Sequence, residues 1–234
     1  MSDRGDSAVA SNRCVDSIKE YDSKIEPVQW EAIQPPRLYE HIVEIFGEFV
    51  SWTWPEKESD DHLDLFTNLF LRHYKTTDMN RVKACALSHM KLWKKCVDDN
   101  ETMVILEHDA TFIRHFDPQD LIWDKSWGAI ALNNPQGATR KGQYYHSLIS
   151  VLGKGIHKIP AIDKKDEPPL PHGLPGNSAY IIRPHAAKEL LRTTKKIGIW
   201  PNDALMCTQL FPWLTIAYPY YTELQGVVST TTQS

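Results

Sequence analysis

Two carboxylates stand directly after a short apolar run. Met103–Leu106 consists of four large apolar residues, and Glu107 and Asp109 follow it. Such a run is typical of a strand that is buried on both faces of a parallel sheet. Side chains two residues apart in an extended chain point to the same side, with their Cα atoms about 7 Å apart. Two carboxylates that converge there repel each other and lose hydration, and a divalent cation would compensate both effects.

Mn2+ or Mg2+ is the cation that these residues favour, because hard cations take carboxylate, phosphate and water oxygens as ligands. The residues alone leave an alternative open, in which one acid caps the next turn and the other is solvated. His108 lies between the two acids. In an extended chain its side chain points the opposite way, where it would be structural, although it could also supply a third ligand.

A long amphipathic helix is predicted just before this motif. Apolar residues between Val82 and Val97 recur at helical spacing over about four turns. Asp78 or Asn80 is placed to cap its beginning, and the polar segment 98–100 ends it. A helix, a tight turn and a buried strand in this order indicate an α/β protein.

Further elements are predicted on both sides of the motif. Upstream we expect a helix over 13–21, a strand over 28–33, and one or two short helices between 42 and 74. Downstream we expect strands at 127–132, 179–182 and 214–218, a helix from Pro184 to Gly198, and a short helix that opens at Pro201. The segment 136–171 is rich in glycine, proline and basic residues, and is predicted to be an irregular, mobile substrate loop.

Length and composition favour one globular α/β domain that spans residues 1–234. No apolar run approaches the roughly eighteen residues that a membrane span needs, so no stable membrane insertion is expected. The polar beginning lacks a secretory signal, which makes the cytoplasm the default location. A net charge of −4 argues against a protein that coats DNA. The four cysteines are widely spaced without a Cys-x-x-Cys pair, so neither a disulfide framework nor a zinc knuckle is expected.

Several segments, in order along the chain, resemble glycosyltransferase family 25. The segment 81–93, RVKACALSHMKLW, and the segment 103–110, MVILEHDA, are similar to a family helix with the pattern C-x-L-S-H-x-x-x-W that leads into a hydrophobic strand and an E-D-D-A turn. The segment 172–187 is similar to a later strand and helix of the family, and 199–203 to its P-x-D element. The family includes lipooligosaccharide and collagen hydroxylysine galactosyltransferases.

The resemblance implies a GT-A-like fold, which is an open, mostly parallel sheet flanked by helices that binds a nucleotide sugar at its carboxyl edge. It also implies metal-dependent transfer with inversion. Glu107 and Asp109 would then hold Mn2+ or Mg2+ on the donor diphosphate, and Asp203 would be the general base for the acceptor hydroxyl. The residues alone also allow Asp203 to be a helix cap.

The resemblance further implies a set of polar residues that contact the donor or the acceptor: Arg81, Ser88, His89, His108, Asn133, Asn177 and Ser178. Arg81 could reach the donor phosphates from a helix start, whereas Ser88 and His89 could instead be structural. Turn formation alone also explains the Gly-Asn-Ser segment 176–178. The chain departs from the family pattern twice, since His108 replaces the middle acid and a polar segment stands where members begin with an apolar strand. We therefore expect the donor pocket to be completed differently, or the chain to begin late.

The resemblance therefore implies a hexosyltransferase. It would move galactose or glucose from a nucleotide sugar, with UDP as the expected carrier, to a hydroxyl of a glycan, a protein or a modified nucleobase. One alternative is a catalytically idle protein of the same fold that binds a nucleotide sugar or a glycan. Another is a metal-dependent phosphoesterase, which would need more ligands than these motifs supply.

Overall fold

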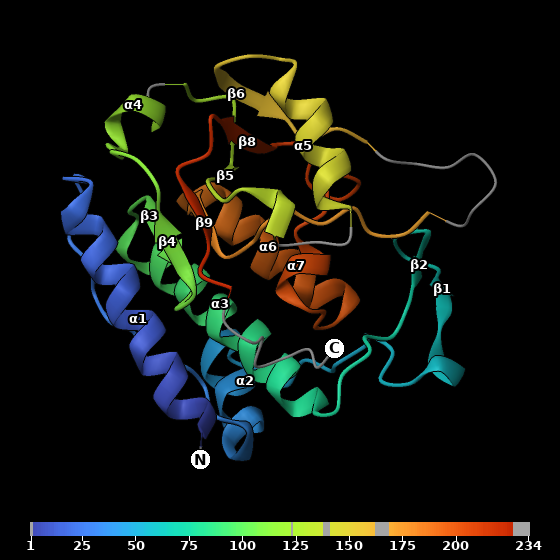
Figure 1. Cartoon of the computed structure of the whole chain (residues 1–234). Coiled ribbons are helices and arrows are strands. Elements are labelled where there is room, and N and C mark those ends of the chain that lie inside the picture. The colour runs from blue at the N-terminus through green and yellow to red at the C-terminus, as the bar shows by residue number, and fades with distance from the viewer. Residues whose placement is uncertain (1, 123, 138–140, 162–168, 227–234) are drawn as a thin grey trace.

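A five-stranded sheet forms the centre of the protein (Figure 1). The computed structural model describes residues 2–122, 124–137, 141–161 and 169–226, without the side chains of 2–6 and 122. In spatial order the strands are β3 (Met103–Leu106), β7 (Ala179–Ile182), β5 (Ala129–Ala131), β8 (Leu214–Tyr218) and β6 (Gly155–Lys158). The strands predicted near 103, 127, 179 and 214 are therefore all present.

The prediction of a mostly parallel sheet is wrong, because only β5 and β8 run parallel among the described pairs. The pairs β3–β7, β7–β5 and β8–β6 are antiparallel. A continuous apolar run shows that both faces of a strand are covered, and it does not give the strand's direction. All four residues of β7 are buried although both of its neighbours are antiparallel to it. β3, expected to be buried on both faces, lies at the edge of the sheet, and only Ile105 in it is buried.

Helix α3 (Met79–Asp99) begins and ends where the sequence predicts. The Asp78 side chain accepts a hydrogen bond from the Asn80 amide at 3.0 Å, and Asn100 ends the helix in the left-handed conformation with φ 55°. Helix α6 (Pro184–Ile197) packs along α3 and stops at Gly198, also as predicted.

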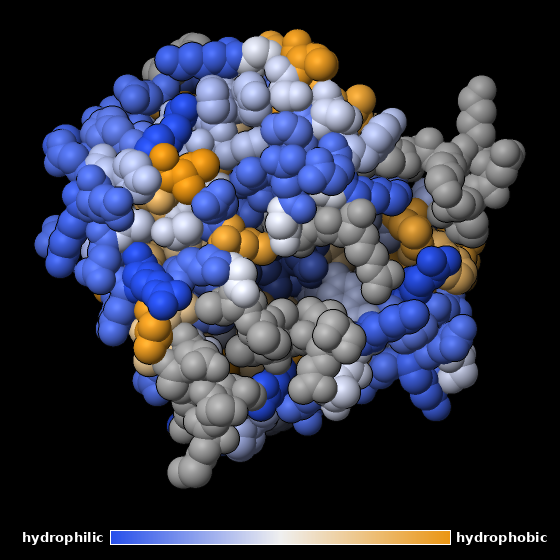
Figure 2. All heavy atoms as spheres, viewed as in Figure 1, coloured by the Kyte–Doolittle hydropathy of each residue, from blue (hydrophilic) through white to orange (hydrophobic). Residues whose placement is uncertain are grey.

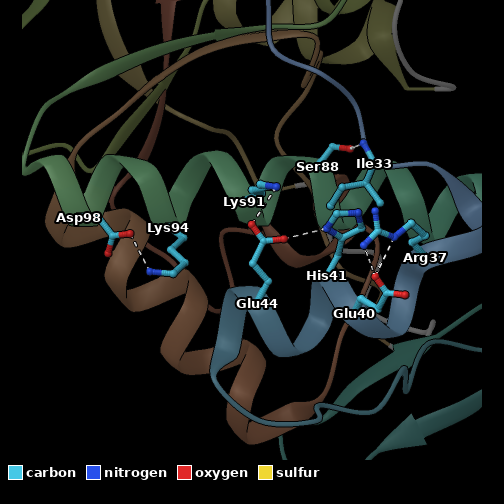
Figure 3. A network of polar contacts seen from close by, with 9 residues as sticks. All are labelled: Ile33, Arg37, Glu40, His41, Glu44, Ser88, Lys91, Lys94 and Asp98. Carbon is cyan, nitrogen blue, oxygen red and sulfur yellow. Dashed lines mark hydrogen bonds and ion pairs between the residues drawn. The ribbon is translucent and has the colours of Figure 1, made fainter.

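Helix α2 (Leu38–Phe46) packs on another side of α3. Glu44 of α2 accepts a hydrogen bond from Lys91 at 2.9 Å and contacts His41 at 3.0 Å (Figure 3). The segment 28–33, predicted as a strand, is irregular instead, and its last amide, that of Ile33, donates to the Ser88 hydroxyl at 2.9 Å. The alternation of Val28, Trp30 and Ala32 does not mark a covered face, because these side chains are exposed and only Ile33 is buried.

The two faces of the sheet pack into separate cores. Tyr180 and Ile182 of β7 point into a core shared with α3 and α6, whereas Ala179 and Ile181 point into a core shared with the N-terminal helix. That helix, α1 (Ser2–Glu20), covers the predicted 13–21 helix and extends beyond it. It packs against β4 (Ala110–Phe112), which pairs with β9 (Thr222–Leu224).

The remaining elements are short. They are η1 (Pro35–Arg37), η2 (Glu58–Asp60), the hairpin of β1 (His62–Asp64) and β2 (Leu69–Leu71), α4 (Gln119–Ile122), η3 (Pro135–Gly137), α5 (Gly142–Ser150) and α7 (Asn202–Leu205). The segment 136–171 is thus not irregular throughout, because it contains most of η3, all of α5 and the edge strand β6. Its parts 138–140 and 162–168 lie outside the described residues, and its role as a mobile substrate loop stays a prediction. No helix in the described part of the chain is long and apolar enough to cross a bilayer.

Candidate active site

The two acids that follow β3 lie in a tight turn. The Ala110 amide donates to the Glu107 carbonyl at 3.1 Å, and the Glu107 amide donates to the Ser178 carbonyl at 2.7 Å. The extended conformation expected for Glu107 to Asp109 is therefore wrong, although both side chains are half-buried at the same end of the strand. Because β3 and β7 are antiparallel, this end of β3 lies beside the beginning of β7.

Glu107 is oriented by a chain of hydrogen bonds from the core. His89 Nε2 lies 3.2 Å from Glu107 Oε1, and His89 Nδ1 lies 2.8 Å from Tyr180 Oη. Trp93 Nε1 donates to Tyr180 Oη at 2.8 Å. Since a carboxylate only accepts, the His89 proton belongs on Nε2, and Nδ1 then accepts from the Tyr180 hydroxyl. Burial raises the pKa of Tyr180 well above its ordinary value, so that this hydroxyl keeps its proton.

Three of the residues in and beside these hydrogen bonds come from one face of α3. Cys85, His89 and Trp93 are spaced four residues apart, which places them above one another on a helix. The sequence assigns them to an apolar stripe, and the structure shows that this stripe carries polar atoms toward Glu107. The role of Tyr180 was missed because a tyrosine in a buried strand is more often a packing residue.

Asp203 joins the site from the short helix α7. Its Oδ1 accepts a hydrogen bond from Tyr74 Oη at 2.8 Å, and the Tyr74 ring lies edge-on to Trp54 with centroids 5.5 Å apart. The N-cap position of α7 is Pro201, so Asp203 is not the capping residue. Asp203 is exposed by its solvent-accessible surface, although enough protein atoms lie around its carboxyl group for burial to raise its pKa. Tyr74 was missed because no periodic pattern marks its part of the sequence.

A glycine fixes the path of the chain beside Asp203. A Cβ on Gly173 would lie 2.0 Å from the Asp203 carbonyl oxygen, which no side chain tolerates. Gly173 also forms an isolated bridge with Cys207. The segment that begins at His172 therefore lies against α7, and Gly173 is the residue that allows this approach.

The carboxylates influence one another. Burial raises the pKa of Asp109, the charge of Glu107 raises it further, and His108 partly offsets the shift. Burial likewise raises the pKa of Asp203, and the charge of Glu107 adds to this, while the Tyr74 hydrogen bond lowers it. Burial and then Glu107, Asp203 and Asp109 raise the pKa of Cys85 well above its ordinary value. These three acids therefore share one electrostatic environment, in which a cation would be stabilised.

Several buried polar atoms beside the turn have no hydrogen-bond partner among the residues that the structure describes. They are Asp109 Oδ1, Asn177 Oδ1 and Nδ2, and Ser178 Oγ. Leaving such a group unpaired costs about 1–3 kcal/mol, and folded proteins rarely do so. Asn177 and Ser178 precede β7, and β7 pairs with β3, which Glu107 follows. This edge of the sheet is therefore suited to a ligand with polar groups, and the carboxylate, amide and hydroxyl oxygens suit a hard cation.

The other predicted residues lie as follows. Arg81 is exposed and pairs with Asp78, with its Nε 3.4 Å from Asp78 Oδ2. Ser88 makes its hydrogen bonds elsewhere, with the Ile33 amide and with the Ala84 carbonyl, and its side chain faces the segment before α2 (Figure 3).

Asn133 packs against the segment that leads to Asn177. Its side chain is fully buried, accepts from the Thr222 hydroxyl at 3.1 Å and donates to the Asn134 carbonyl at 3.1 Å. A Cβ on Gly176 would lie 2.9 Å from Asn133 Nδ2, so Gly176 lets the chain pass close to Asn133 just before Asn177.

Figure 2 shows a hollow near the middle of the viewed face, beside the position of α7, with hydrophilic residues at its floor.

Comparison with known proteins gives one family match. The model described as glycosyltransferase family 25 (LPS biosynthesis protein) matches residues 48–206. The matched range is more than half of the chain, and it contains Tyr74, Cys85, the Glu107–Asp109 turn and Asp203. A search of curated proteins found no match.

Proposed function

Because this chain belongs to glycosyltransferase family 25 and is therefore a glycosyltransferase, we propose that it transfers a hexose, galactose or glucose, from a nucleotide sugar to an acceptor hydroxyl with inversion at the anomeric carbon. The expected donor is linked to UDP, and the acceptor is a hydroxyl of a glycan, a protein or a modified nucleobase. The mixed α/β sheet is consistent with the GT-A-like fold that such an enzyme would use.

The observation that carries this proposal is that Glu107 lies close enough to both Asp109 and Asp203 for its charge to act on each of them. The pKa values of Asp109 and Asp203 are raised by burial and by the charge of Glu107. Like charges held in this way favour a divalent cation, and Glu107 and Asp109 are the residues that would hold Mn2+ or Mg2+. When bound, the ion would balance the charge of the donor diphosphate.

Asp203 suits the role of general base. Its raised pKa brings it closer to the working pH, which is the condition for efficient proton transfer. The Tyr74 hydroxyl donates to one carboxylate oxygen, and the backbone amides of Ala204 and Asp203 also bond the carboxylate. The exposed side of the carboxylate would take the proton of the acceptor hydroxyl as the acceptor oxygen attacks the anomeric carbon. We expect the buried amide of Asn177 and hydroxyl of Ser178 to bond the hydroxyls of a bound sugar.

The test is the substitution Asp203→Asn, which keeps the shape and removes the base. Release of nucleoside diphosphate is measured with a panel of UDP-sugars, Mn2+ and hydroxyl acceptors, and donor binding is measured by calorimetry. Turnover should fall by about 10²–10⁴-fold while donor affinity stays the same. Asp99→Asn, which changes an exposed acid paired with Lys95 at the end of α3, is the matched control. Unchanged turnover in Asp203→Asn would exclude it as the base, and donor binding without turnover in the wild type would favour the idle binding protein.

A further inference from the structure

Three potential metal ligands of different chemistry meet beneath the Glu107 turn. The thiol of Cys85, the imidazole of His89 and the carboxylate of Glu107 each offer one atom, and these atoms all lie within 4.8 Å of one another. Cys85 and Glu107 are half-buried rather than fully buried. His89 is buried between them on the same face of α3 as Cys85.

The spacing of these atoms suits a tetrahedral ion. Two nitrogen or oxygen ligands at about 2.0–2.1 Å from a tetrahedral Zn2+ are roughly 3.3 Å apart. The observed distance between His89 Nε2 and Glu107 Oε1 is 3.2 Å. The pair therefore already has the separation that a shared ion requires, and Cys85 lies one helical turn before His89 to supply the longer sulfur bond.

The surroundings of His89 also suit a ligand. A metal-bound histidine usually donates its second ring proton to a fixed acceptor. His89 Nδ1 lies 2.8 Å from Tyr180 Oη, which Trp93 holds in place. When an ion replaces the proton on Nε2, that proton moves to Nδ1, and Tyr180 Oη then accepts from both His89 Nδ1 and Trp93 Nε1 while its own hydroxyl hydrogen turns away from the imidazole. The thiol proton of Cys85 passes to solvent, so that binding releases one proton.

We propose that Cys85, His89 and Glu107 form a binding site for a thiophilic divalent cation such as Zn2+, and that filling this site inhibits sugar transfer. Thiolate and imidazole ligands select zinc-like ions, whereas Mg2+ and Mn2+ prefer oxygen ligands. An ion held here fixes the Glu107 carboxylate against α3 and withdraws it from Asp109. The inhibition rests on the proposed role of Glu107 in holding the donor's metal, whereas the binding does not.

The binding is tested by titrating the metal-free protein with Cd2+, whose bond to a thiolate gives an ultraviolet charge-transfer band. The wild type should show this band and saturate at one ion per chain. Cys85→Ser should lose the band, and Glu107→Gln should bind Cd2+ more weakly. Cys14→Ser, which changes a buried cysteine of α1, should keep it. Circular dichroism checks that each variant is folded. No band in the wild type, or an unchanged band in Cys85→Ser, would overturn the site.

The inhibition is tested by adding Zn2+ to enzyme saturated with Mn2+ and a nucleotide sugar. The wild type should lose most of its turnover, and Cys85→Ser should keep most of its own zinc-free rate. Equal inhibition of both proteins would overturn the inhibitory role. If the wild type turned over no nucleotide sugar under any condition, the proposed function would fail, and the Cd2+ titration would still decide the metal site.

Discussion

Removal of one hydroxyl, by Tyr74→Phe, tests how the protein tunes its proposed base. Tyr74 Oη donates to Asp203 Oδ1 at 2.8 Å, and the Tyr74 ring packs edge-on against Trp54. Phenylalanine keeps the ring and its packing, so the substitution removes the hydrogen bond alone. This bond stabilises the ionised carboxylate and lowers the pKa of Asp203, against the effects of burial and of the charge of Glu107.

The size of the effect follows from the charge on the acceptor. A hydrogen bond to a charged group contributes about 1.5–3 kcal/mol, which corresponds to a factor of roughly 10–150. Asp203 is partly open to solvent, so the lower end of this range, about tenfold, applies. Below its pKa, the ionised fraction of Asp203 and the transfer rate should therefore fall about tenfold. On the alkaline plateau the carboxylate is ionised with or without Tyr74, and the rate should stay the same.

The assay is the pH profile of kcat/KM for nucleotide-sugar turnover at saturating Mn2+. The acidic limb of Tyr74→Phe should move to higher pH, and its plateau should match that of the wild type. Tyr39→Phe, at an exposed tyrosine of α2, serves as the control and should reproduce the wild-type profile. Superimposable profiles of Tyr74→Phe and the wild type would refute the reasoning. An equal loss at every pH would also refute it, because Tyr74 would then act on the substrate or on the position of Asp203.

Three further substitutions test the surroundings of the site. The pKa of Asp109 is raised in the folded protein, so its contribution to stability is lost as the pH rises through that pKa. At neutral pH, metal-free Asp109→Asn should therefore unfold at a higher temperature than the metal-free wild type, and Mn2+ should not raise that temperature further. An unfolding temperature below that of the wild type would contradict this. Gly173→Ala should reduce turnover, because its Cβ would meet the Asp203 carbonyl oxygen at 2.0 Å. Gly137→Ala should not, because the nearest atom of the described residues is Leu224 Cδ1 at 4.0 Å. Equal rates of the two variants would contradict the steric argument. Tyr180→Phe leaves His89 Nδ1 and Trp93 Nε1 unpaired, and it should lower the free energy of unfolding in urea by about 2–4 kcal/mol. A loss below about 1 kcal/mol would show that these hydrogen bonds contribute little to stability.

The sequence predicts local structure well where caps and periodicity agree. Helix α3 combines an apolar stripe with a capping Asp78 and a terminal Asn100, and both of its ends were predicted. The helix after Pro184 likewise ends at Gly198. These signals act between residues close in the chain, which is why they can be recognised without the fold.

Strand direction and long-range partners could not be predicted in the same way. The fully buried strand β7 has the apolar pattern of a parallel strand and pairs antiparallel on both sides. The alternating segment 28–33 pairs with no strand, and its last amide bonds to Ser88 of a helix. The proximity of Tyr74 to Asp203 depends on contacts between segments 129 residues apart, and no local pattern records such contacts.

The helix motif and the acidic turn that carry the family resemblance form one physical unit. Trp93 fixes the Tyr180 hydroxyl, Tyr180 fixes the orientation of the His89 ring, and His89 holds one oxygen of Glu107. Each of these groups has few other ways to satisfy its buried polar atoms, so the orientation of Glu107 is set by the core of α3 as well as by the turn. The four-residue spacing of Cys85, His89 and Trp93 therefore brings a thiol, a base and a hydrogen-bond donor to the same acid. For that reason the core of α3 and the proposed metal site cannot be altered independently of each other.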